Sequence, residues 1–251
     1  LCIKNDASYH DMYYMNPPAK DLSKIASSDK VKKVQKDFEA THVRPQRLMK
    51  TLFTDEAYVK ANVDEARLMR RLFDLACNMQ SHDTDMQLYS LFTDEECYDL
   101  WSCNNLYWYL THACSPVTDG LMPYREADLL RNILDRADAA LKEGKNQATL
   151  RFGHESCLLP LVALLELNHY GESYPDVEKL SEQWRAYDIF PMASNVQFVF
   201  FHKKGSNDVL VKVLLNEKET KLPVKTDVAP YYHWKDVESY YREKLDKYQH
   251  I

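Results

Sequence analysis

A histidine and a glutamate stand side by side at positions 154 and 155, where the chain is expected to pass from a strand into a helix. An apolar run ends at Gly153, and an apolar helix is predicted to begin directly after it. The positive end of a helix attracts anions, and a histidine beside a carboxylic acid can hold and transfer protons. These features point to phosphoryl chemistry at His154 and Glu155. The same two residues could instead simply cap the following helix.

The segment around this pair reads Arg-Phe-Gly-His-Glu-Ser-Cys-Leu-Leu-Pro-Leu from residue 151. It resembles the second catalytic motif of the histidine acid phosphatases, and most of all the branch of multiple inositol polyphosphate phosphatases and phytases. The resemblance continues in order through residues 120–123, 190–195, 209–217 and 227–234, and residues 90–245 carry it best. Several ordered segments at similar spacing are more specific than one short motif.

The resemblance implies a phosphohistidine mechanism. In the family, an upstream histidine attacks phosphorus, and an acid protonates the leaving alkoxide and then helps to activate water. A second histidine hydrogen-bonds the phosphoryl oxygens. His154 stands in the place of that second histidine, and Glu155 in the place of the acid. The inositol polyphosphate branch commonly has its acid one residue later, where this chain has Ser156. No metal or organic cofactor is implied.

The family's nucleophile lies in an Arg-His-Gly-x-Arg-x-Pro motif far upstream, and this sequence contains no Arg-His-Gly. The chain also begins at Leu1 rather than at Met. We therefore expect it to be the C-terminal portion of a longer protein, with the missing N-terminal half as its partner in the site. The alternative is a catalytically inactive module that binds a phosphorylated ligand or a partner chain.

Three basic residues, Arg44, Arg47 and Lys50, are candidates for binding the other phosphates of a substrate such as an inositol polyphosphate. In the family a helical domain roofs the pocket, and arginine and lysine are the usual phosphate ligands. The three could equally form a solvated basic helix face. A second His-Asp pair, His82-Asp83, follows a predicted helix in a polar run, so a capping role there is favoured over catalysis.

Composition excludes other classes of function. The net charge of −6 gives no basic footprint for nucleic acid, and no apolar run approaches the roughly 20 residues of a membrane span. The six cysteines lack the Cys-x-x-Cys spacing of metal sites; they could form disulfides or remain free thiols. The family resemblance implies a periplasmic or secreted location.

The predicted fold class is α/β, with part of a histidine-phosphatase sheet core joined to a mostly helical insertion subdomain. We expect an irregular lead-in over residues 1–20, the helical subdomain over 21–145 and the C-terminal part of the core over 146–251. The predicted helices cover 21–60 with a break near Pro45, 64–80, a segment opened by a Thr93–Glu96 capping box, 124–143, the turn at 154 to about 168, and a final helix from Trp234. The predicted strands are 148–153, a hairpin of 195–202 and 208–216, and 219–224.

Overall fold

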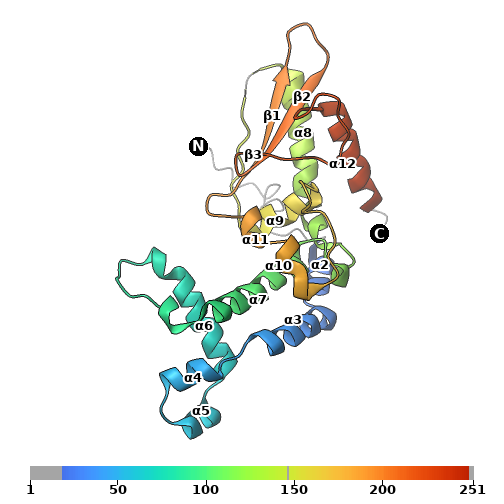
Figure 1. Cartoon of the computed structure of the whole chain (residues 1–251). Coiled ribbons are helices and arrows are strands. Elements are labelled where there is room, and N and C mark those ends of the chain that lie inside the picture. Colours follow the sequence, from blue (N-terminus) through green and yellow to red (C-terminus); the bar gives the residue numbers. More distant parts are fainter. Residues whose placement is uncertain (1–18, 146, 249–251) are drawn as a thin grey trace. The chain divides into compact units, whose positions relative to one another are not determined.

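The computed structural model describes residues 19–145 and 147–248 (Figure 1). The irregular lead-in expected over residues 1–20 lies outside this part of the chain, except for its last two residues. The chain divides into two compact units, one formed by Lys32–Tyr107 and the other by Leu1–Val31 together with Trp108–Ile251.

The unit Lys32–Tyr107 is helical and surrounds a small apolar core. Its helices are α3 (Asp29–His42), α4 (Gln46–Leu52), α5 (Glu56–Asn62), α6 (Glu65–Asn78) and the larger part of α7 (Asp94–His112), with short 3-10 turns η1 (Met79–Ser81) and η2 (Tyr89–Leu91). The predicted break near Pro45 is confirmed, because α3 ends at His42 and α4 begins at Gln46. The core side chains are Leu48, Met49, Val59, Met69, Ala76, Phe92 and Leu100.

Local capping signals fix the starts of these helices. Asp64 accepts a hydrogen bond from the Arg67 N–H at 3.0 Å and begins α6. The predicted capping box is confirmed at the start of α7. The Thr93 N–H donates to Glu96 Oε2 at 3.0 Å, and the Glu96 N–H donates to Thr93 Oγ1 at 3.2 Å. Two N–H groups that an isolated helix leaves unpaired are satisfied in this way.

The other unit combines helices with one small sheet. Its elements are α2 (Ala19–Ala26), the end of α7, η3 (Pro116–Thr118), η4 (Met122–Glu126), α8 (Ala127–Glu143), α9 (Glu155–Leu164), η5 (Val177–Lys179), α10 (Leu180–Gln183), α11 (Ala186–Ile189), β1 (Val196–His202), β2 (Val209–Leu215), β3 (Lys218–Glu219), β4 (Tyr232–His233) and α12 (Trp234–Tyr248) (Figure 1). The predicted stop of α8 at Gly144 is confirmed, since this glycine takes φ +65 at the helix end.

The sheet is antiparallel throughout the described residues. The predicted hairpin is confirmed, with β1 and β2 paired from Val196 opposite Leu215 to His202 opposite Val209. The strands β3 and β4 both pair with β2. The predicted strand over 219–224 is wrong beyond its first residue. The Thr220 N–H still donates to the Val213 carbonyl of β2. The next two N–H groups instead donate to side chains, that of Lys221 to Asn168 at 2.9 Å and that of Leu222 to the Tyr232 hydroxyl at 3.0 Å.

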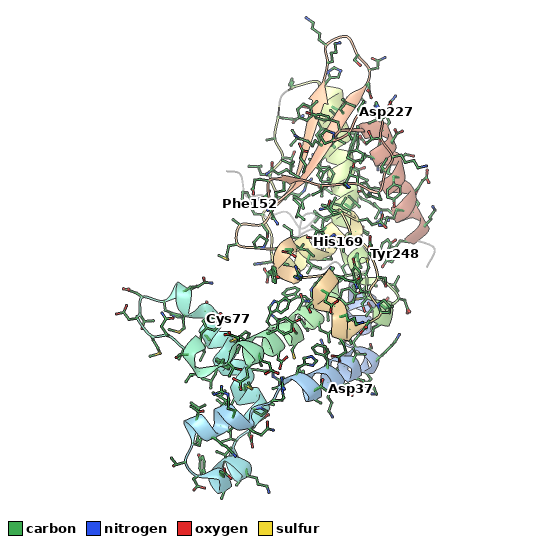
Figure 2. All side chains as sticks on the ribbon, viewed as in Figure 1. Asp37, Cys77, Phe152, His169, Asp227 and Tyr248 are labelled. Carbon is green, nitrogen blue, oxygen red and sulfur yellow. The ribbon has the colours of Figure 1, made fainter. Side chains whose placement is uncertain are left out.

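The predicted strand over 148–153 is also wrong. Residues 147–154 form neither strand nor helix, and no described strand pairs with them. A strand exists only where a neighbour supplies its hydrogen bonds, and an apolar sequence cannot replace that neighbour. The two large apolar side chains of the segment lie exposed. Leu150 is 72% exposed, and Phe152, labelled in Figure 2, is 68% exposed.

The helix α9 ends at Leu164, four residues earlier than predicted. The chain turns there because Glu166 and Asn168 adopt φ of 53 and 54. Side chains from α12 bind the last carbonyls of α9. Tyr241 donates its hydroxyl to the Leu165 carbonyl at 2.8 Å, and Lys244 donates to the Leu164 carbonyl at 2.7 Å. Groups that a helix end leaves unpaired are therefore satisfied inside the unit.

The helical unit runs from Lys32 to Tyr107, whereas the sequence predicts the helical subdomain over residues 21–145. The helix α8 belongs with the sheet because α12 binds it through charged and polar side chains. Arg242 contacts Asp135 at 2.9 Å and Asp138 at 2.7 Å, and the Trp234 indole N–H donates to Asp138 at 2.8 Å. The predicted start of the final helix at Trp234 is confirmed, and this buried side chain also packs edge-on against Phe200.

Candidate functional site

His154 and Glu155 lie together at the N-terminal end of α9. His154 is the last extended residue before the helix, with φ −109 and ψ 165, and Glu155 is the first helical residue. The His154 carbonyl accepts hydrogen bonds from the N–H groups of Cys157 at 3.0 Å and Leu158 at 3.1 Å. The His154 side chain makes no capping hydrogen bond to the helix. The imidazole therefore has no capping role, and both side chains of the pair are exposed.

The burial of the later residues of α9 fixes the position of its N-terminal end. These later residues are buried in the core of the unit: Leu159, Pro160, Leu161, Val162, Ala163 and Leu164. Glu155 and Ser156 come too early in the helix for their N–H groups to reach a carbonyl of α9 itself. A helix end with such N–H groups and a positive partial charge is suited to an anion. A phosphoryl group placed there would meet one imidazole and one carboxyl group.

A buried carboxyl group, which the sequence analysis did not find, lies behind the first turn of α9. Glu126 ends η4, the segment that packs against α9, and is only 4% exposed. Burial raises the pKa of the Glu126 carboxyl to about 7, although the Arg125 guanidinium and a hydrogen bond with the Cys157 thiol act to lower it. Burial also raises the pKa of Cys157, to about 11. The residues next to Glu126 in the sequence do not indicate that its side chain is buried, because a glutamate at the start of a helix is usually exposed.

The three candidate basic residues belong to the helical unit, and two of them form ion pairs with α7. Arg44 contacts Glu95 at 2.8 Å and also Asp99. Arg47 donates two hydrogen bonds to the Glu96 carboxylate, from Nε at 2.8 Å and from Nη2 at 2.5 Å. The hydrogen bond from Arg47 lowers the pKa of Glu96. Both guanidinium groups therefore join α7 to the segment around α4.

Lys50 is bound less tightly than the two arginines. Its ammonium lies 3.9 Å from Glu56, and its side chain is 71% exposed. His154 and Glu155 lie in one compact unit and the three basic residues in the other. The structure thus brings together the predicted catalytic pair and, separately, the predicted basic group.

The second His-Asp pair lies in an exposed turn between α6 and η2. His82 follows η1, and its ring nitrogen lies 3.4 Å from the Asn78 amide. The predicted helix cap is wrong: Thr84 accepts from the Met86 N–H at 3.2 Å within a turn, and no helix begins there. Among the described residues, no group of three His, Cys, Asp or Glu side chains is arranged to hold a metal ion.

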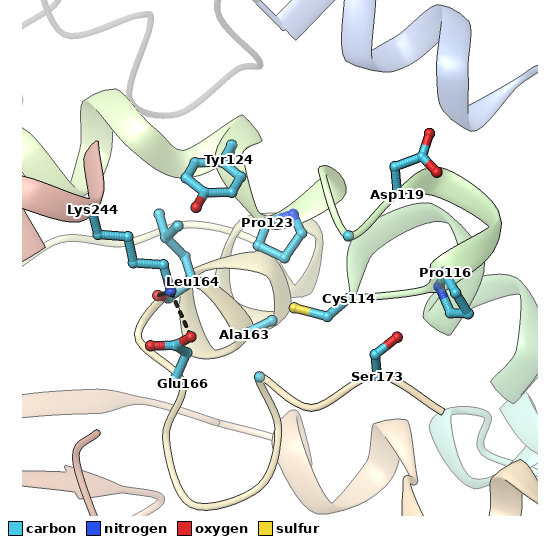
Figure 3. Close-up of a pocket in the computed structure, with 12 residues that line it drawn as sticks. Cys114, Pro116, Asp119, Pro123, Tyr124, Ala163, Leu164, Glu166, Ser173 and Lys244 are labelled. Carbon is cyan, nitrogen blue, oxygen red and sulfur yellow. Dashed lines mark hydrogen bonds and ion pairs between the residues drawn. The ribbon is translucent and has the colours of Figure 1, made fainter. Parts of the chain in front are cut away.

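A pocket of about 560 Å³ lies at the opposite end of α9 (Figure 3). Ala163 and Leu164 form part of its wall, together with the ion pair between Lys244 and Glu166 at 3.1 Å. The ten residues of α9 span roughly 15 Å at 1.5 Å per residue. The pocket is therefore separate from the exposed pair at the start of the helix.

The described cysteines, Cys77, Cys97, Cys103, Cys114 and Cys157, are all free thiols. In the same part of the chain, no helix combines the length and the apolar character that a membrane crossing requires.

An exposed histidine and an exposed acid thus stand together at the start of a buried helix, in a unit of mixed helices and strands. The chain belongs to the histidine phosphatase superfamily, branch 2, whose family model matches residues 4–216. Among curated proteins it is similar to human multiple inositol polyphosphate phosphatase 1, at 28% identity over 134 residues. That match covers 48% of this chain and 27% of the human protein.

Solved structures of the multiple inositol polyphosphate phosphatase of Bifidobacterium longum share the fold. The complex with phosphate matches with a TM-score of 0.62 at 19% identity, covering 96% of this chain and 56% of that one. The complex with inositol hexasulfate matches with a TM-score of 0.56 at 19% identity, covering 94% and 54%. The chain thus spans little more than half of the solved relatives and about a quarter of the curated one.

Proposed function

We propose that this chain is the C-terminal portion of a phosphomonoesterase that hydrolyses inositol polyphosphates through a phosphohistidine. It supplies the proton donor and the second phosphate-binding histidine, and a segment carrying Arg-His-Gly supplies the nucleophile. The observation that carries this proposal is the exposed pair His154 and Glu155 at the N-terminus of α9 in a histidine phosphatase chain. The names of the relatives support inositol polyphosphates as the substrate class.

The two residues have distinct proposed roles. In the first step the nucleophilic histidine forms a bond to phosphorus, the bond from phosphorus to the alkoxide breaks, and Glu155 gives its proton to that alkoxide. In the second step Glu155 takes a proton from water as the water oxygen bonds to phosphorus and the phosphorus–nitrogen bond breaks, which releases phosphate and restores both groups. His154 and the first N–H groups of α9 donate to the phosphoryl oxygens, where negative charge gathers in the transition state.

Arg44, Arg47 and Lys50 remain proposed contacts to the other phosphates of the substrate. For the two arginines, phosphate would compete with the carboxylates of α7. Lys50 has a single distant partner, so its ammonium is the most available of the three. We also propose a periplasmic or secreted location, which rests on the family alone.

The experiment begins with the coding sequence upstream of Leu1. If it encodes Arg-His-Gly in frame, the protein that includes this motif should release phosphate from inositol hexakisphosphate. It should also form an acid-labile phosphohistidine on that motif. Replacement of His154 by Ala should remove most of the release. Release at an unchanged rate in the His154→Ala protein would exclude the proposed site.

A second candidate function is a catalytically inactive module that binds phosphorylated ligands or a partner chain. The absence of Arg-His-Gly from this sequence favours it. A start codon close to Leu1, together with binding of inositol hexakisphosphate without phosphate release, would select this alternative.

A further inference from the structure

We propose that Glu126 is a positioning residue that controls, through its own charge, how tightly the first turn of α9 holds an anion. This inference rests on the proposed function, because the anion is the phosphoryl group bound at His154 and Glu155. Glu126 would not touch that group. It would act through Cys157, which lies on the same turn of α9 as the catalytic pair.

The placement of Glu126 is the first argument. Its side chain is 4% exposed, and its segment η4 packs against α9. Its carboxyl group shares a hydrogen bond with the Cys157 thiol. The Cys157 N–H in turn donates to the His154 carbonyl at 3.0 Å. The Glu126 carboxyl group is therefore linked through Cys157 to the backbone of His154.

The charge of Glu126 is the second argument. A buried carboxylate is poorly screened by solvent, and here it lies behind the end of a helix that would attract an anion. The ionised form would oppose binding of a phosphoryl group, and the neutral form would not. Because its pKa is raised to about 7, the two forms exchange near neutral pH.

Other charged groups near Glu126 are already engaged. Arg125 on its own element donates to the Thr111 carbonyl at 3.1 Å. The ionisable groups on the neighbouring elements α2, α8 and α9 are paired or exposed: Asp21 with Lys24, Asp128 with Arg131, and Glu155 at the surface. Arg125 and Cys157 are the partners that lower the pKa of Glu126, and burial outweighs both.

The test measures anion binding on this chain directly and needs no turnover. Sulfate serves as the probe because, unlike phosphate, it keeps one charge state between pH 5.5 and 8.5. Amide resonances of Glu155, Ser156 and Cys157 report both the bound anion and the titration of the turn. The unmodified chain is compared with Glu126→Gln, which keeps the size of the side chain and stays neutral. Asp128→Asn is the matched control, since it removes a charge from a half-buried position nearby.

In the unmodified chain we expect these amides to titrate with a midpoint near 7. Sulfate affinity should fall about three- to tenfold across that step, because a poorly screened like charge opposes the anion. In Glu126→Gln the part of both changes that comes from Glu126 should be lost, and Asp128→Asn should behave like the unmodified chain. Other titrating groups near the site contribute equally to the amide titration and to the pH dependence of sulfate binding in all three proteins. If Glu126→Gln does not fold, the carboxyl carbon resonance of Glu126 in the unmodified chain gives the midpoint directly.

Binding of sulfate with the same pH dependence in all three proteins would overturn the role of Glu126 and leave the proposed function intact. A Glu126 midpoint near 4 would overturn it as well. Sulfate that fails to bind the unmodified chain at any pH would overturn this inference, while phosphate release by the protein that includes Arg-His-Gly would still decide the proposed function.

Discussion

Glu155 is the residue on which the proposed chemistry depends most directly. It begins α9 and is exposed beside His154. A general acid contributes more to the rate when the leaving group is more basic. In the protein that contains a nucleophile motif, Glu155→Gln should slow hydrolysis of inositol hexakisphosphate by about 10²- to 10³-fold. Hydrolysis of an aryl phosphate, whose phenolate leaves unaided, should slow far less.

Steady-state rates on the two substrates test this prediction. Glu182→Gln, at an exposed position on α10, is the control and should leave both rates unchanged. Equal losses on the inositol and aryl phosphates in Glu155→Gln would remove Glu155 from the role of proton donor.

His233 should make the stability of the sheet unit depend on pH. Its Nδ1 lies 3.0 Å from Asp208 and its Nε2 lies 2.9 Å from Asp227. The hydrogen bonds to Asp208 and Asp227 raise the pKa of His233. A raised pKa means that the folded form holds the proton more tightly than the unfolded form. The added stability is therefore full below about pH 6.5, the ordinary histidine value, and is lost as the pH rises through the raised pKa.

Thermal unfolding between pH 5 and pH 9 measures this effect. The difference in Tm between the unmodified chain and His233→Gln should be largest near pH 5 to 6 and shrink at alkaline pH. His202→Gln is the control in the same sheet, where the ring faces the Ser206 carbonyl instead of two carboxylates. A Tm difference that is constant over this range would contradict the prediction.

At the scale of single elements, the start of α7 should be sensitive to its capping box. Thr93→Ala removes the side chain that accepts from the Glu96 N–H. We expect a loss of about 1 kcal/mol in the free energy of unfolding, the usual cost of removing a helix cap. Urea titration followed by circular dichroism gives the value.

Thr51→Ala is the matched control for the capping box. The Thr51 hydroxyl donates only to the Arg47 carbonyl within its own helix and is exposed, so the loss should be much smaller. Equal losses from the two substitutions would show that the capping hydrogen bond contributes nothing of its own.

Elements specified by neighbouring residues could be predicted from the sequence, and those specified by distant partners could not. The Thr93–Glu96 box and the stop at Gly144 depend on contacts within a few residues. The segment 148–153 has the apolar pattern of a strand but no described strand beside it. The place of α8 depends on Arg242, more than a hundred residues downstream of Asp135.

The same distinction applies to the candidate site. His154 and Glu155 are adjacent in sequence and lie just before an apolar helix, so their exposure at its first turn could be anticipated. The burial of Glu126 could not, because it results from the packing of η4 against α9. The ion pairs of Arg44 and Arg47 likewise depend on acids of α7 about fifty residues away.

At the scale of the whole molecule, the chain exposes apolar side chains that a protein in isolation tends to cover. Leu150 and Phe152 precede the site, and Met192 is 94% exposed. Exposed apolar side chains favour association. We expect residues 1–251 expressed alone to self-associate, and Leu150→Ser with Phe152→Ser to reduce this. Sedimentation velocity measures the distribution of species.

Leu75→Ser is the control for the association experiment. Leu75 is also exposed, at 51%, but lies on α6 in the helical unit. It should change the distribution less than the pair next to the site. A monodisperse monomer with a single sharp unfolding transition would contradict the expectation.

The hydrogen bonds that close α9 have a consequence for the order in which the protein is made. Tyr241 and Lys244 bind the last carbonyls of α9 from 76 and 80 residues downstream. At the usual rate of synthesis, α12 leaves the ribosome about 4 to 16 seconds after the helix that it completes. Until then the Leu164 and Leu165 carbonyls lack these two side-chain partners. The proposed site residues His154 and Glu155 are therefore synthesised well before the final helix that completes the other end of α9.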